Sequence, residues 1–381
     1  MRIAALADLH LGFRAFHARA EGTRRNLREV DVEQTWGRVV EQVLAEGVDL
    51  VTIAGDLFHH PRVSDYAKRA FLNGVGRLAQ VSPVIVLQGN HDAGKSGEVL
   101  TPVALAEALV GTHYPVHVVT DVQRVRVGRD LSVTCIPYVD QSEGRTYRLR
   151  PNGEAIYNVL LAHAAVRSSA DGAGKLPYFY GGDGTALDVG KQADLWDAIL
   201  LGDYHEFTRL HPTRPVFYSG SIDRTSSNIW QEEASKGWAL VDIDTGSVEF
   251  REVATRPMWN EVISAPFADD VNHAVEEIAY QAEQVDGERP MVRLRVDDFD
   301  RAEKRLIDWG QVNALKKMVA HFYLDLRYRP LEIADLGERR DAGEKVTLAS
   351  EAKAYFADAP EAVRDLVFEE LGVTAEVRRL G

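Results

Sequence analysis

LVTIAGDLFHH, at residues 50–60, joins an apolar run to a turn that carries one aspartate and two histidines. The aliphatic and β-branched residues of 49–54 predict a buried strand, because such side chains suit an enclosed, pleated surface. A glycine then permits a tight turn, and the polar group follows directly. Two further apolar runs, 2–7 and 83–87, lead in the same way into DLH and GNHD. The pattern therefore predicts a sheet whose strand ends carry polar side chains.

Helical patterns separate these three strands. Apolar residues recur at helical spacing over 32–44 and again between Tyr66 and Leu78. Strands that alternate with helices indicate an α/β fold with a largely parallel sheet. Seven later runs favour strands with almost no helix between them, at 125–127, 132–136, 157–162, 198–201, 216–218, 238–243 and 247–253. They predict a second sheet packed on the first, so the expected fold class is two packed sheets flanked by helices.

The pattern changes near residue 256. Strands are predicted at 259–264, 291–296 and 322–328, and helices at 269–285 and 301–319, which together indicate a small α+β domain. A polar stretch at 337–345, GERRDAGEK, is typical of a linker, and a helical pattern follows at 350–371. We therefore expect three parts, at 1–255, 256–336 and 337–381.

Composition excludes several classes of protein. The 381 residues are 45% hydrophobic and 27% charged, which is typical of a soluble globular protein. We find no apolar run long enough to span a membrane, and a single cysteine, Cys135, so a cytoplasmic location is expected. The net charge of −14 argues against a protein that coats nucleic acid by bulk attraction. It does not exclude a nuclease, because bound cations offset metal-binding carboxylates.

Five short motifs each follow an apolar strand. They are DLHLG at 8–12, GDLFHH at 55–60, GNHD at 89–92, LLAH ending at 163, and GDYH at 202–205. Ligand sites in open α/β sheets form at the carboxyl ends of strands, so these motifs should meet at one edge. Ions such as Mn²⁺ accept carboxylate, amide and imidazole ligands, and one carboxylate can bridge two ions about 3.5–4 Å apart. The motifs therefore predict a two-metal site that hydrolyses phosphate esters.

Each motif alone has a simpler explanation. An Asp-x-His pair is usually not a pair of ligands, and Gly-Asp is common in turns. GNHD is more specific, because Asn and His between turn residues serve little purpose in a core. All five motifs, in this order and each after a strand, favour a metal site over chance.

The order DxH, GD, GNHD, H and GxxH resembles that of the calcineurin-like metallophosphoesterases. The extended GDLFH at 55–59 is similar to the SbcD-type nucleases of DNA double-strand-break repair. YSGS at 218–221 followed by KG at 236–237 resembles the YPGS…KG segment of that family, with serine in place of proline. The resemblance is strong over about residues 1–255. It is weak over the rest, where it implies a DNA-capping α+β domain and a helical tail.

The resemblance also implies a role for each motif residue. The implied metal ligands are Asp8, His10 and His205 for the first ion, Asp56 as a bridge, and Asn90, His163 and Asp203 for the second. His91 would lie outside the metal ligands and face the leaving oxygen, as a proton donor or as a stabiliser of the transition state. His59 would lie near the site and influence how DNA is placed.

Asp203 departs from the family pattern. The family usually has GHxH at the last motif, with both histidines as ligands, whereas this chain has aspartate first. An aspartate reaches less far and favours harder ions such as Mn²⁺ or Mg²⁺. Ligation of the second ion and a role outside the ligand set both stay open.

For the whole protein, the resemblance implies a DNA exonuclease and endonuclease of repair and recombination that uses two divalent ions, Mn²⁺ first and Mg²⁺ as a possibility. It implies a homodimer and an SbcC-like SMC-type ATPase as partner, to which the tail at 337–381 would bind. Two alternatives stay open: a phosphodiesterase for small molecules or nucleotides, and a metal-binding scaffold without catalysis.

Arginines are frequent in the loop after the first motif. Such a run is usually a solvated face, but beside a phosphodiester site it could contact DNA phosphates. Both interpretations stay open for Arg14, Arg19, Arg24, Arg25 and Arg28.

Overall fold

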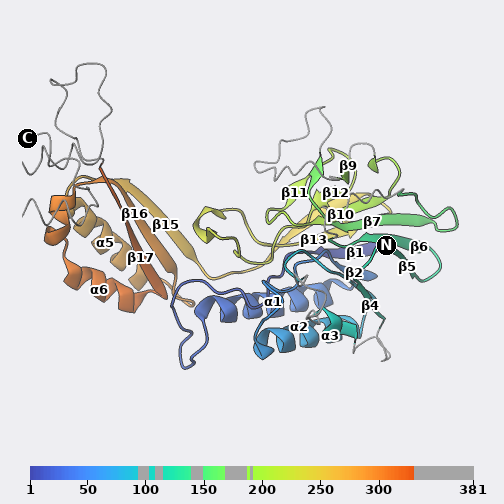
Figure 1. Cartoon of the computed structure of the whole chain (residues 1–381), viewed down its shortest axis with the longest axis horizontal. Helices are drawn as coiled ribbons and strands as arrows, with labels where there is room; N and C mark the ends of the chain where they lie inside the picture. Colours follow the sequence, from blue (N-terminus) through green and yellow to red (C-terminus); the bar gives the residue numbers. More distant parts are fainter. Residues whose placement is uncertain (93–102, 108–114, 139–148, 168–186, 189–191, 330–381) are drawn as a thin grey trace, which may run out of the picture. The chain divides into compact units, whose positions relative to one another are not determined.

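The computed structural model describes residues 1–92, 103–107, 115–138, 149–167, 187–188 and 192–329 (Figure 1). The chain divides into two compact units, Met1–Arg327 and Tyr328–Gly381. The predicted linker at 337–345 and helical tail at 350–371 lie outside the described residues. The expected boundaries at 255 and 336 stay predictions.

The first sheet has six strands in the order β14-β13-β1-β2-β3-β4. Four of them are parallel neighbours, β1 (Arg2–Leu6), β2 (Leu50–Ile53), β3 (Val84–Leu87) and β4 (Val116–Val119). The other two are antiparallel, β13 (Gly237–Asp242) beside β1, and β14 (Ser247–Glu252) beside β13. We expected these last two strands in the second sheet, and that was wrong. They join the first sheet because β13 pairs with the side of β1 that β2 leaves open, where it covers unpaired backbone groups.

Two long helices cover this sheet. The side chain of Asn26 accepts a hydrogen bond from Arg28 N to begin α1 (Leu27–Glu46), five residues before the predicted start, and Ser64 caps α2 (Asp65–Leu78) in the same way. The helices pack tightly, since a Cβ added at Gly74 of α2 would lie 2.2 Å from Trp36 Nε1. Trp36 is buried and donates this N–H to Ala70 O at 3.0 Å. A short helix, α3 (Ala104–Glu107), was not predicted.

The second sheet also has six strands, in the order β11-β12-β10-β7-β6-β5. Four parallel strands form its centre: β6 (Leu131–Ile136), β7 (Tyr157–His163), β10 (Ala198–Gly202) and β12 (Val216–Tyr218). An antiparallel strand lies at each edge, β5 (Gln123–Val127) beside β6 and β11 (Thr208–Arg209) beside β12. Both sheets contribute to one buried cluster, in which Ile3 and Ile85 meet Leu161 and Leu200. The prediction of two packed sheets is therefore confirmed. Beside them lie the short pair β8 (Val166–Arg167) and β9 (Leu187–Asp188) and the 3-10 turn η2 (Ile229–Gln231).

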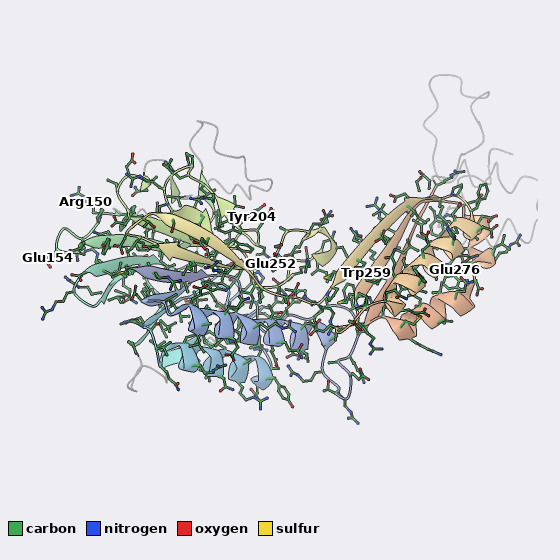
Figure 2. The ribbon with its side chains drawn as sticks, turned by 180° about the vertical axis from the view of Figure 1, so that it is seen from behind. Arg150, Glu154, Tyr204, Glu252, Trp259 and Glu276 are labelled. Atoms are coloured by element: carbon green, nitrogen blue, oxygen red, sulfur yellow. The ribbon has the colours of Figure 1, made fainter. Side chains whose placement is uncertain are left out.

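A third sheet has the order β15-β16-β17, and Figure 2 labels Trp259 on its first strand. Its elements are β15 (Met258–Ser264), α5 (Ala268–Glu283), β16 (Met291–Phe299), the 3-10 helix η3 (Arg301–Leu306), α6 (Trp309–Met318) and β17 (His321–Tyr328). A single helix at 301–319 was predicted, and the structure divides it. Ile307 has extended backbone (ψ 132°), and Asp308 then caps α6 by accepting from Gly310 N.

No helix in the described part of the chain is long and apolar enough to cross a membrane.

Candidate metal centre

Five strands deliver the predicted site residues, three from the first sheet and two from the second. Asp8 follows β1, Asp56 follows β2, and Asn90 follows β3. His163 ends β7, and Asp203 follows β10. Tyr204, labelled in Figure 2, comes next in the turn after β10, and its ring lies 5.7 Å from that of Tyr218, centroid to centroid. The carboxyl ends of both sheets thus contribute to one site, as the strand-end rule predicts.

Glycine is required where the two sheets meet. Gly55 has a φ of 84°, and a Cβ added there would lie 2.3 Å from His163 Nδ1. A Cβ at Gly202 would lie 1.9 Å from Ala54 O. Both distances are far inside van der Waals contact, so any side chain at either position would force the sheets apart. The two glycines therefore set the separation between ligands that come from different sheets.

The backbone is strained at the site. Residues other than glycine rarely have a positive φ, and each instance costs on the order of 1–3 kcal/mol. Among the described residues six do so, and four of these are predicted ligands: Asp8 at 50°, His10 at 44°, Asp56 at 51° and Asp203 at 103°. Such strain gathers at functional sites because the surrounding packing must hold it in place.

Asp8, His10 and His205 form one group of donor atoms within 4.8 Å of one another. The Nε2 atoms of His10 and His205 are 3.0 Å apart, and His10 Nε2 lies 3.6 Å from Asp56 Oδ2. The structure thus brings together the residues predicted for the first ion. Their assignment as ligands stays a prediction.

A second group forms around His163. Its Nε2 lies 2.8 Å from Asn90 Oδ1, 3.5 Å from Asp56 Oδ1 and 3.8 Å from Asp203 Oδ1. Its other ring nitrogen, Nδ1, donates to Ala54 O at 2.7 Å. That hydrogen bond holds a proton on Nδ1, so Nε2 is the ring nitrogen that could bind a metal, the usual arrangement of a metal-binding histidine.

Asp56 lies between the two groups. Its Oδ2 faces His10 and its Oδ1 faces His163, and the backbone N–H of His91 donates to Oδ1 at 2.9 Å. This is the position that a bridging carboxylate would need.

The donor atoms fit a divalent cation. The side chain of Asn90 lies 2.8 Å from His163 Nε2 and close to the carboxylate of Asp56. Carboxylate, amide and imidazole groups that meet in this way can each turn a lone pair toward one bound cation. Oxygen and imidazole ligands in one group suit Mn²⁺, and other divalent ions of similar preference.

The closely packed carboxylates and histidines of the site shift one another's pKa values. Burial raises the pKa of Asp8 well above its ordinary value; His163 lowers it, and the neighbouring carboxylates raise it further. Burial acts to lower the pKa of His163, but the carboxylates around it, with Asp56 first, raise it to about 9. Burial and four neighbouring histidines hold the pKa of His10 well below its usual range. Positive charge placed among these carboxylates would relieve their mutual repulsion.

Asp203 follows β10, and its backbone N–H also contacts the carboxylate of Asp8. Its N–H lies 3.2 Å from both carboxylate oxygens of Asp8, and its side chain is 39% exposed. The carboxylate therefore lies beside the second group but keeps one side toward solvent. The role of Asp203 as a ligand of the second ion stays a prediction.

His91 and His59 lie next to the donor groups. His91 Nδ1 donates to His59 O at 2.7 Å, and the two rings stack with centroids 5.3 Å apart. His59 Nδ1 lies 3.4 Å from His10 Nδ1, and burial, with His91 next, lowers the pKa of His59 to about 4. These three histidines form a third group of donor atoms within 4.8 Å. The catalytic roles of His91 and His59 therefore stay predictions, with metal binding as the competing role.

Asp92, the last residue of GNHD, was missed from sequence. It is fully buried and accepts hydrogen bonds from Leu57 N, Phe58 N and Gly89 N at 3.2, 2.9 and 2.8 Å. It thereby ties the turn after β2 to the turn after β3, which positions Asp56 against Asn90. Burial, and then Asp56, raise the pKa of Asp92 to about 7. The signal in the sequence that could have indicated this role was the acidic residue at the end of GNHD.

The arginines after the first motif are partly structural. Arg28 is buried and pairs with Asp31 and Asp223 at 2.9 and 2.7 Å, so it cannot contact DNA. Arg14 pairs with Glu29 at 2.9 Å. A DNA-contacting run of all five arginines is therefore wrong, because α1 uses some of them to anchor itself.

Comparisons with known proteins show what this chain is similar to. A family profile described as calcineurin-like phosphoesterase matches residues 1–207. Relatives from Haloferax volcanii and Thermoplasma acidophilum, each named DNA double-strand break repair protein Mre11, are both 25% identical to this chain, over 387 and 308 residues. The alignments cover 98% and 76% of this chain, and 75% of each relative. A solved structure, that of TT1561 from Thermus thermophilus, covers 66% of this chain and 98% of its own at 13% identity. Its TM-score of 0.38 is too low to support an argument.

Proposed function

The chain belongs to the calcineurin-like phosphoesterase family, and on that premise we propose that it is a two-metal nuclease that hydrolyses the phosphodiester bonds of DNA. One observation carries the proposal: the carboxylate of Asp56 lies between two groups of donor atoms that five strand ends supply, with one oxygen toward each group. A structural carboxylate would not need a second group of lone pairs around it.

The residues of the site have different roles in the proposed reaction. Bound divalent ions would activate a water molecule and offset charge on the phosphoryl oxygens. His163 and Asp56 hold their donor atoms toward the site, because Ala54 O and the backbone of His91 orient them. His91 donates its Nδ1 proton to His59 O, so Nε2 is the nitrogen that can hold and deliver a proton to the leaving oxygen.

DNA as the substrate is supported by the relatives, which are named as DNA double-strand break repair proteins. In the small α+β part, Arg301, Ala302, Lys304, Arg305 and Trp309 line an open hollow of about 620 Å³. Positive and aromatic side chains on one surface suit phosphates and bases. We further propose Mn²⁺ as the preferred ion, a homodimer, and an SbcC-like ATPase that binds the tail at 337–381.

Three substrates test the proposal on the full chain: supercoiled plasmid, end-labelled duplex DNA and bis(p-nitrophenyl) phosphate. Each is incubated with Mn²⁺, with Mg²⁺, or with EDTA. The Asp56→Asn variant, purified in parallel, controls for contaminating nuclease. We expect Mn²⁺-dependent cleavage of both DNA substrates that EDTA and the variant abolish.

The other outcomes identify the alternatives. Hydrolysis of bis(p-nitrophenyl) phosphate without DNA cleavage would indicate a phosphodiesterase for small molecules. Bound metal without hydrolysis of any of the three would indicate a scaffold. Either result would overturn the proposal.

A further inference from the structure

The YSGS…KG segment, 218–221 with 236–237, lies directly behind one predicted metal ligand, His205. Ser221 N donates to His205 O at 3.1 Å, and Lys236 Nζ donates to the same oxygen at 2.9 Å. Gly220, with a φ of 76°, makes the approach possible, since a Cβ there would lie 2.7 Å from Phe207 N. The segment therefore fixes the backbone of the turn that presents His205.

Lys236 joins the two sheets at this point. Its backbone belongs to the first sheet, because Val253 N donates to Lys236 O at 2.8 Å and β13 begins at the next residue. Its side chain is 2% exposed and crosses to the turn after β10 in the second sheet. There Nζ also donates to Ser221 Oγ at 3.0 Å and to Glu232 Oε2 at 2.5 Å. All three ammonium protons thus have acceptors, as a buried cation requires.

Glu232 faces the far side of the His205 ring. Ser226 N donates to Glu232 Oε1 at 2.6 Å, which directs Oε2 toward Lys236 and His205. Oε2 lies 3.9 Å from His205 Nδ1. Among the described residues this nitrogen is buried and has no hydrogen-bond partner, while Nε2 of the same ring faces His10 at 3.0 Å. A buried N–H without a partner is unfavourable, so a small movement that brings Glu232 Oε2 within hydrogen-bond distance of Nδ1 is favoured.

We propose that Lys236 and Glu232 are positioning residues for the first-ion ligand His205. Lys236 fixes the backbone of the histidine and the carboxylate of Glu232. Glu232 accepts a hydrogen bond from the Nδ1–H of His205, so that the Nε2 lone pair is kept for the ion. Carboxylates that orient metal-binding histidines in this way are common, and their loss typically weakens metal binding about 10–100-fold. This inference rests on the proposed function, since it takes His205 as a ligand.

The test measures Mn²⁺ binding to the full chain by calorimetry. His205→Ala first identifies the binding step that belongs to the first ion. Glu232→Gln and Lys236→Met should then weaken that step by about 10–100-fold and leave the other step unchanged. Lys236→Arg, which keeps the charge and the donors, should restore much of the affinity. Glu232→Gln changes no shape and carries the test if Lys236→Met does not fold.

A matched control separates positioning from general destabilisation. Arg256→Met breaks another buried ion pair, in which Arg256 Nη2 lies 2.7 Å from Asp31 Oδ1 and the arginine is 11% exposed, the same as Glu232. It should lower the melting temperature and leave both Mn²⁺ binding steps unchanged. Normal binding in Glu232→Gln, or equal weakening of both steps, would overturn this inference alone. If His205→Ala keeps both ions at full affinity, the proposed ligand set fails instead.

Discussion

Replacement of His91 by alanine should separate catalysis from metal binding, because this residue contacts the site in two ways. Its backbone N–H donates to Asp56 Oδ1 at 2.9 Å, and its ring Nδ1 donates to His59 O at 2.7 Å. Alanine keeps the first hydrogen bond and removes the second. The carboxylate predicted to bridge the ions therefore keeps its orientation, and only the group predicted to transfer a proton is lost.

The expected loss can be estimated from these contacts. Loss of a general acid typically slows a reaction about 10²–10⁴-fold, which corresponds to roughly 2.7–5.4 kcal/mol in the activation barrier. The lost hydrogen bond contributes about 1 kcal/mol to stability, so the variant should still fold. His60→Ala provides the matched control. His60 is exposed, and its ring lies 5.4 Å from that of His59 on the same turn, so this variant should keep the wild-type rate.

Two measurements on each variant decide the question: metal content by mass spectrometry and kcat/KM for cleavage of end-labelled duplex DNA with saturating Mn²⁺, because the alkoxide that leaves from DNA requires a proton. We expect His91→Ala to hold as much metal as the wild type and to lose at least about 10²-fold in kcat/KM. If metal is lost as well, the group of His10, His59 and His91 holds an ion and the proton-donor role is wrong. A decrease below tenfold with full metal content would also refute it.

Four further variants test the remaining assignments. Asp56→Asn should lose most of the bound metal, because both ions lose a charged ligand, and two full equivalents in this variant would exclude the bridging role. Asp203→His should stay active with a changed metal preference, and Asp203→Ala should lose one ion only; an alanine variant with unchanged metal content and Mn²⁺ dependence would show that Asp203 is not a ligand. Deletion of residues 346–381 should preserve folding and Mn²⁺-dependent cleavage of simple DNA but abolish co-purification with the ATPase. An unfolded truncated chain, or one that still binds the partner fully, would contradict the docking role.

Most strands of the two large sheets could be predicted because their signals are local, but β4 and β11 were missed. Apolar runs such as 83–87 predict strands from their own residues, and β3 (Val84–Leu87) matches within one residue. Sheet membership depends on pairing between distant residues, so the return of β13 to the edge of β1 could not be predicted. The helix break at Asp308 was missed because apolar residues continue at helical spacing on both sides of it. The hydrogen bonds by which Asp308 caps α6 are visible only in the structure.

The residues of the site also divide into those that the sequence could predict and those that it could not. Asp8, Asp56 and His163 could be located from sequence, because each follows or ends an apolar strand and parallel strands end at one edge. Asp92 and Lys236 could not be interpreted, because their importance lies in what they contact across the fold. Asp92 binds backbone N–H groups of another turn, and Lys236 binds a carbonyl 31 residues away.

Strain and rigidity at the metal centre depend on each other. The left-handed backbone of Asp8, His10, Asp56 and Asp203 costs several kcal/mol in total, a large fraction of the roughly 5–15 kcal/mol by which domains are usually stable. Such a cost persists only where packing allows no relaxed alternative, and here Gly55 and Gly202 let the two sheets close on each other directly below the ligands. A turn with relaxed backbone would point its side chain elsewhere. The close contact between the sheets therefore holds the donor atoms near one another before any ion binds, so that binding requires little rearrangement of the protein.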